Sequence, residues 1–129
     1  MFSSQGYASA ARRYAAIDTS SRVEGATPHQ LVRILFEELL RAMDSATLAL
    51  KGGDMAKATE RQTRALTILH ALESSLDFEK GGEIALSLAT IYRESRRRMI
   101  RAIGEKDAAP MESARAFIAD IASAWDQIA

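Results

Sequence analysis

The sequence predicts an all-α protein, an antiparallel four-helix bundle that follows a mobile N-terminal arm. Apolar residues recur three and four positions apart over four long stretches, which is the period of an amphipathic helix. Only 7 glycines and 2 prolines occur in 129 residues, and they fall in the arm, between these stretches or in their first turns. The stretches are joined by a few residues each, so consecutive helices are expected to pack as antiparallel neighbours.

The N-terminal segment differs in pattern from the rest of the chain. We expect residues 1–26 to form the arm and residues 27–129 to form the bundle. The arm is rich in Ser, Ala and Gly, has no sustained apolar period, and carries isolated large residues such as Tyr14 and Ile17. One short helix around residues 8–17 is compatible with this pattern, and the arm as a whole is predicted to be mobile.

The first helix is expected over residues 28–51. Thr27 can cap it, and Pro28 suits the first helical position because its missing N–H would be unpaired there in any case. The glycine pair at 52–53 ends it. Its apolar face is wider than a single stripe, because a second apolar row lies beside the first: Val32, Phe36, Leu40 and Met43.

Three further helices are expected over residues 54–76, 83–103 and 107–128, with residues 78–82 as the link between the second and third. The predicted core face of the third helix consists of Ile84, Leu88, Ile91, Tyr92, Met99, Ala102 and Ile103. The stripe of the fourth helix is the most regular and consists of Met111, Ala114, Phe117, Ile118, Ile121, Ala122, Trp125 and Ile128.

Composition excludes several classes of protein. The formal net charge is zero, so the whole molecule has no general attraction for nucleic acid or anionic membranes. There are no cysteines, which excludes disulfides and thiolate zinc sites. No apolar run approaches the ~20 residues needed to span a bilayer, and residues 1–14 lack the apolar centre of a signal peptide. We therefore expect a cytoplasmic protein with no membrane insertion.

Catalytic and metal-binding residues are not expected. Di-iron sites in helical bundles need Glu-x-x-His pairs, but the residues three positions before His29 and His70 are Ala26 and Thr67. The glycine pairs are not followed by the Lys-Ser/Thr of a phosphate-binding loop. With two histidines, acid–base chemistry has few candidates. The sequence thus predicts a protein that is not an enzyme, with no metal, cofactor or small-molecule substrate.

Two alternative functions remain open. Arg93, Arg97 and Arg101 form one ridge on the third helix, which could bind nucleic acid. Zero net charge favours instead a solvated face that pairs with the acidic fourth helix, since residues 107–129 carry four acidic residues and one basic. His70 could be a phosphorylation site in a signalling relay, but a glutamate three positions further on would repel a phosphate, which favours a histidine with no special role.

Surplus apolar surface is the most informative feature for function. A bundle helix needs about three apolar positions per heptad. The first helix exceeds that number, and Leu86 lies outside the stripe of the third helix. The excess is compatible with a homodimer, with a better-covered core, or with a groove for a segment of a partner protein. The apolar pattern does not rank these three explanations.

Three stretches of the chain form recognisable motifs: Ala-Thr-Pro-His-Gln-Leu at 26–31 with Tyr14 upstream, Leu-Asp-Phe-Glu-Lys-Gly-Gly-Glu-Ile-Ala at 76–85 followed by Leu88 and Ile91-Tyr92, and Ala-Trp-Asp-Gln-Ile-Ala at 124–129. By these motifs the chain resembles the FliS family of flagellar secretion chaperones over nearly its whole length. The chain departs from the family after Tyr92, where a second aromatic residue and a methionine are replaced by an arginine-rich run.

The resemblance implies a cytoplasmic chaperone that binds the disordered C-terminal segment of flagellin, prevents its premature polymerisation and delivers it to the flagellar export apparatus. The client would order as it docks on apolar grooves, which the arm can cover in part when they are empty. The expected contact residues are Tyr14, Ile17, Leu35, Leu39, Leu66, Leu69, Leu88, Ile91 and Tyr92.

Overall fold

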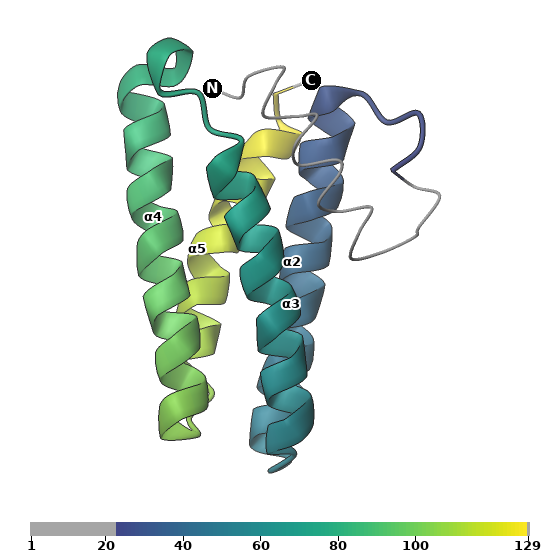
Figure 1. Ribbon diagram of the computed structural model, residues 1–129, viewed down its shortest axis with the longest axis vertical. Helices are drawn as coiled ribbons and strands as arrows, with labels where there is room; N and C mark the ends of the chain where they lie inside the picture. The colour runs from purple at the N-terminus through teal and green to yellow at the C-terminus, as the bar shows by residue number, and fades with distance from the viewer. Residues whose placement is uncertain (1–22, 129) are drawn as a thin grey trace.

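The computed structural model describes residues 23–128, and these residues form a bundle of four helices (Figure 1). The helices are α2 (Pro28–Lys51), α3 (Met55–Ser74), α4 (Phe78–Glu105) and α5 (Ala109–Asp126). The predicted all-α, four-helix architecture is therefore confirmed. The predicted arm, including Tyr14 and Ile17, lies outside the described residues except for its last four positions.

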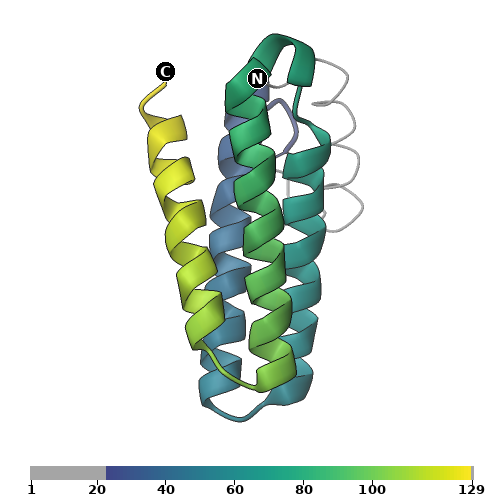
Figure 2. The same ribbon diagram turned by 90° about the vertical axis from the view of Figure 1, so that its left-hand side faces the viewer.

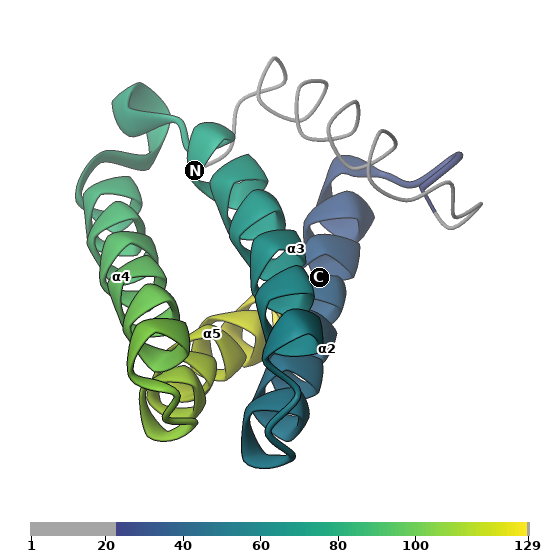
Figure 3. The ribbon, with the colours of Figure 1, turned by 60° about the horizontal axis from the view of Figure 1, so that its bottom comes forward.

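Each helix packs against two others, so that the bundle is a closed ring in the order α2, α3, α4, α5. Consecutive helices run in opposite directions, and α5 returns to pack against α2 (Figure 1). The start of α2 and the end of α5 therefore meet at one end of the bundle. In Figure 2, α5 begins beside the end of α4 and leans away from α4 towards its own C-terminal end. Figure 3 shows α5 crossing behind the bundle towards α2.

Side-chain caps fix where α2 and α3 begin. The Thr27 hydroxyl accepts a hydrogen bond from the Gln30 N–H at 3.1 Å, and the Gln30 side-chain oxygen accepts one from the Thr27 N–H at 3.0 Å. This reciprocal pair is a capping box, and it satisfies two N–H groups that the helix leaves unpaired. Asp54 caps α3 by accepting from the Lys57 N–H at 3.1 Å.

The corner between α3 and α4 differs from the link expected over residues 78–82. Asp77 accepts hydrogen bonds from the N–H groups of Glu79 and Lys80, at 3.1 and 3.0 Å, and starts a helical turn at Phe78. Gly82 then breaks the helical path with φ 50° and ψ −127°, a conformation that glycine adopts without steric cost. The long, regular part of α4 follows this kink.

The second apolar row of α2 lies in the core. Val32, Phe36 and Met43 are buried as fully as Leu35 and Leu39 on the first row. Because α2 contacts both α3 and α5, its apolar face must pack against two neighbouring helices instead of one. A well-covered core thus accounts for the width of the α2 face.

The core face of α4 contains polar side chains. Gln62 of α3 donates to the Met99 carbonyl oxygen at 3.1 Å. Among the described residues, the buried Tyr92 hydroxyl has no hydrogen-bond partner, and neither does the buried Ser95 hydroxyl. Burial raises the pKa of the Tyr92 hydroxyl above its ordinary value, and the nearby Glu73 carboxylate raises it further.

At one end of the bundle, His29 and Trp125 join the first turn of α2 to the last turn of α5. Their rings stack with centroids 4.6 Å apart and planes 12° apart. The Trp125 indole N–H donates to the His29 carbonyl oxygen at 3.1 Å, and the His29 Nε2 donates to the Trp125 carbonyl oxygen at 3.2 Å. We call this arrangement the His29–Trp125 clasp. It ties the C-terminal end of α5 to α2.

Replacement of the unpartnered hydroxyl by Tyr92→Phe should leave the free energy of unfolding unchanged or raise it by up to about 1 kcal/mol, because a buried polar group is removed without loss of a hydrogen bond. Urea denaturation measures this difference. The control Tyr92→Ala should cost about 3–5 kcal/mol, because it opens a cavity. A loss above about 1 kcal/mol in Tyr92→Phe would mean that the hydroxyl makes a stabilising bond.

The same hydroxyl should make stability sensitive to high pH. Its pKa is higher in the folded than in the unfolded protein, so loss of its proton favours the unfolded chain. The free energy of unfolding should therefore be constant below the unfolded pKa and decrease as pH rises above about 10. Denaturation curves recorded at increasing pH should show this decrease in the wild type and a smaller one in Tyr92→Phe. Equal slopes in both proteins would contradict the prediction.

Loss of the clasp should be visible in the fluorescence of Trp125, the one tryptophan of the chain. His29→Ala removes the stacked ring and one hydrogen bond, and should cost about 1–2 kcal/mol. The emission of the indole should shift to longer wavelength as water reaches it. The matched control is His70→Ala, which removes an exposed histidine from α3 and should change neither quantity.

Candidate partner-binding groove

An apolar groove runs between α4 and α5. It has a volume of about 390 Å³ and is lined by Thr90, Ile91, Glu94, Phe117, Asp120 and Ile121. Ile91, Phe117 and Ile121 supply the apolar lining, and none of the three is fully buried. Such a surface costs free energy when it is left in water, so it favours a partner that covers it.

The apolar surface continues from this groove along both helices. Ile84 precedes Ile91 by seven residues, which is two helical turns or about 10 Å along the same side of α4. Ile128 lies two residues past the end of α5 and is an exposed apolar side chain at the same end of the bundle. These two side chains are 65% and 59% exposed. The groove together with Ile84 and Ile128 is called the α4–α5 groove below.

The two ends of α5 are held by different neighbours. Near its start, the Arg98 side chain of α4 donates to the Ser113 hydroxyl, and its guanidinium lies 4.7 Å from the centre of the Phe117 ring. At the other end, the clasp binds Trp125 to His29 of α2. The groove is therefore closed at the Arg98 end, and α4 and α5 diverge towards the clasp (Figure 2).

The residues expected to contact a partner lie in different surroundings. Leu35, Leu39, Leu69 and Tyr92 are fully buried in the bundle, and Leu88 is almost so. Leu66 and Ile91 are partly exposed, and of these two Ile91 lines the α4–α5 groove. A buried leucine and a groove leucine have the same periodicity, which is why sequence does not separate them.

Several groove residues were expected in the core. Ile84 was assigned to the core face of α4, and Phe117, Ile121 and Ile128 to that of α5. The structure places one edge of each wide stripe outside the core, because only the centre of the stripe faces the other helices. The stripe of α5 has eight apolar positions in 18 residues, about three per heptad, so its width does not mark a groove in the sequence.

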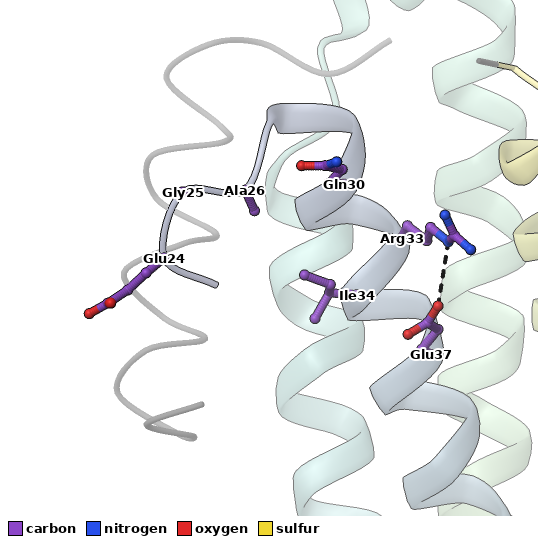
Figure 4. Close-up of a pocket in the computed structure, with 7 residues that line it drawn as sticks. All are labelled: Glu24, Gly25, Ala26, Gln30, Arg33, Ile34 and Glu37. Atoms are coloured by element: carbon purple, nitrogen blue, oxygen red, sulfur yellow. Dashed lines mark ion pairs between the residues drawn. The ribbon is translucent and has the colours of Figure 1, made fainter. Parts of the chain in front are cut away.

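A second concave region lies beside the first turns of α2. It has a volume of about 440 Å³ and is lined by Glu24, Gly25, Ala26, Gln30, Arg33, Ile34 and Glu37 (Figure 4). Ile34 points from α2 towards the segment that precedes the helix, and Arg33 pairs with Glu37 at 3.5 Å (Figure 4). Most of its side chains are polar, so it lacks the apolar lining of the α4–α5 groove.

The arginine ridge of α4 is paired, as the favoured interpretation required, but not with the acidic residues of α5. Arg93 and Arg96 both pair with Glu73 of α3, and Arg97 pairs with Glu94 of α4 itself. Two acidic residues of α5 pair with α2 instead, Glu112 with Lys51 at 2.8 Å and Asp126 with Arg33 at 3.4 Å. The expected charge match between α4 and α5 was therefore wrong, because Arg93 pairs with α3 while Arg97 and Arg101 pair within α4 itself.

His70 is exposed and lies beside Ser74, with 3.4 Å between its Nε2 and the Ser74 hydroxyl oxygen. Glu73, which follows in the chain, is engaged with two arginines. Within the described part of the chain, no three His, Cys, Asp or Glu side chains gather closely enough to hold a metal ion. In residues 23–128, no helix combines the length and apolar character required to cross a membrane.

Comparison with known proteins gives a family. Residues 10–129 match the model of the family described as flagellar protein FliS. The flagellar secretion chaperone FliS of Salmonella typhimurium is 38% identical over 122 residues, which cover 94% of this chain and 90% of the relative. The proteins of the same name from Vibrio cholerae and Bacillus subtilis are 30% and 26% identical, over 89% and 81% of this chain and 85% and 77% of theirs. The chain belongs to the FliS family of flagellar secretion chaperones.

Proposed function

We propose that this protein is a cytoplasmic export chaperone that binds the disordered C-terminal segment of flagellin in the α4–α5 groove, prevents premature polymerisation and delivers flagellin to the export apparatus. The observation that carries the proposal is the open apolar groove in a chain that is 38% identical to a flagellar secretion chaperone. The role requires binding and no catalysis.

The shape and chemistry of the groove suit a helical segment of the client. Its apolar side chains are spaced one and two turns apart along two antiparallel helices, so a partner helix with apolar residues at similar spacing can cover them. The polar Thr90, Glu94 and Asp120 stand among them and leave room for polar contacts with the client. The gain from covering Ile91, Phe117 and Ile121 would offset the entropy that a disordered client loses as it orders.

An open end is useful for a client longer than one helix. Ile84 and Ile128 extend the apolar surface towards the end of the bundle where α2 begins. A client helix in the groove could therefore continue straight past this open end. The closed end lies at Arg98, where α4 and α5 are held together. Several weak contacts spread over such a length give a large contact area with modest affinity per area, which favours later release.

The variants Ile91→Asp and Ile121→Asp test the groove. Each places a carboxylate among apolar side chains, and each should weaken binding of a flagellin C-terminal peptide at least about tenfold, equivalent to about 1.4 kcal/mol. Isothermal titration calorimetry measures the affinity. Neither side chain is fully buried, so both variants should remain folded, as circular dichroism would verify.

The matched control is Leu48→Asp, which replaces an exposed apolar residue of α2 near the opposite end of the bundle. It should bind the peptide as the wild type does. A flagellin polymerisation assay provides a second readout, in which the wild type and Leu48→Asp suppress filament growth and Ile121→Asp does not. If the wild type gives neither heat nor a stoichiometric complex at tens of micromolar peptide, the proposed function is wrong.

A further inference from the structure

A second surface lies on the other side of α4. It consists of Phe78, Leu86, Arg93, Arg96 and Ile100 of α4 with His70, Glu73 and Ser74 of α3, and we call it the α3–α4 face. We propose that the α3–α4 face binds an acidic amphipathic segment of another protein, at a site separate from the α4–α5 groove. The proposal goes beyond the binding of flagellin and does not depend on it.

The spacing of three side chains on α4 suggests a helical partner. Leu86, Arg93 and Ile100 are seven residues apart, so they form one row with steps of about 10 Å. Leu86 and Ile100 are each more than half exposed, and so is the Arg93 side chain. The row therefore presents apolar, cationic and apolar groups in that order, which fits a helix with an acidic centre between two apolar positions.

The row of side chains on α4 borders a concavity beside Arg93. Its volume is about 470 Å³, and it is lined by His70, Glu73 and Ser74 of α3 and by Phe78, Arg93 and Arg96 of α4. Phe78 is almost half exposed, although it is one of the largest apolar side chains. The Asp77 cap and the kink at Gly82 hold it at the corner, where it can cover an apolar side chain of a partner.

The charge of the face is positive. Arg93 and Arg96 share one carboxylate, that of Glu73. Two guanidinium groups therefore meet one carboxylate within the face, which leaves one positive charge. A carboxylate of the partner can bind Arg93 while Arg96 still holds Glu73, so no buried charge loses its counterion. Charge complementarity thus selects an acidic partner.

An acidic protein segment fits this face better than a nucleic acid. The zero net charge gives no long-range attraction for a polyanion. The exposed Phe78, Leu86 and Ile100 suit the apolar side chains of a polypeptide, which a sugar–phosphate backbone lacks.

The two surfaces do not overlap. Ile84 and Ile91 lie on the edge of α4 that faces α5, whereas Arg96 faces α3 and pairs with Glu73. The core seam of α4, which contains Tyr92, runs between these edges. One segment can therefore occupy the α4–α5 groove while another occupies the α3–α4 face.

A synthetic peptide provides the probe. It is a fluorescein-labelled helix of Ala, Glu and Leu with two leucines fourteen residues apart and glutamates midway between them, and its charge-reversed form has Lys for Glu. Fluorescence anisotropy should detect binding of the acidic peptide and not of the basic one. Arg93→Ala should weaken binding about tenfold, and Phe78→Ser and Leu86→Ser about threefold each. Circular dichroism verifies that the variants are folded.

The matched control is Arg101→Ala, which removes an exposed arginine of the same ridge, outside the α3–α4 face, and should leave binding unchanged. Saturation with the flagellin peptide should also leave it unchanged, and Ile121→Asp should still bind the probe. The proposal is overturned if the wild type does not bind the acidic peptide at a hundred micromolar. Equal losses in Arg93→Ala and Arg101→Ala, displacement by the flagellin peptide, or tighter binding of a DNA oligonucleotide would also overturn it.

Discussion

The structure depends on the need to cover the apolar face of α2 on two sides. That face carries two rows of large side chains, represented by Leu35 and Phe36, and both rows are buried. A single neighbour covers only one of them, so α3 packs against one side and α5 against the other. The clasp fixes the second contact, because it binds the end of α5 to the start of α2. Since α5 is drawn towards α2, it diverges from α4, and this divergence leaves the α4–α5 groove.

Helix α4 serves three purposes with three sides. Its buried seam, which includes Tyr92 and Met99, closes the core. One flanking edge presents Ile84 and Ile91 to the groove, and the other places Arg96 against Glu73 of α3. The arginines form ion pairs on the outer surface, while the isoleucines remain uncovered beside α5. A helix can separate these roles because residues one position apart point about 100° apart around its axis.

Much of the fold was predictable from local signals. The Thr27–Gln30 capping box and the Asp54 cap are recognisable in the sequence, because they involve residues three positions apart. The corner at Phe78 was less predictable, because one capped turn before a glycine is too short to show a period. Of the partner-binding residues expected from sequence, Ile91 lines the groove. The other apolar groove residues, Phe117 and Ile121, were expected in the apolar stripe of the fourth helix and not as partner contacts. The arm residues Tyr14 and Ile17 lie outside the described residues.

The sequence by itself determined the helical period, the number of helices and the family, because these depend on residue types at fixed short spacings. Only the tertiary structure decided which apolar rows are core and which are surface. Phe36 and Phe117 look alike in their helical patterns, but the first is buried in the core and the second faces a groove. The difference arises from the angle at which α5 crosses the bundle, and that angle is set by contacts such as His29–Trp125, between residues 96 positions apart.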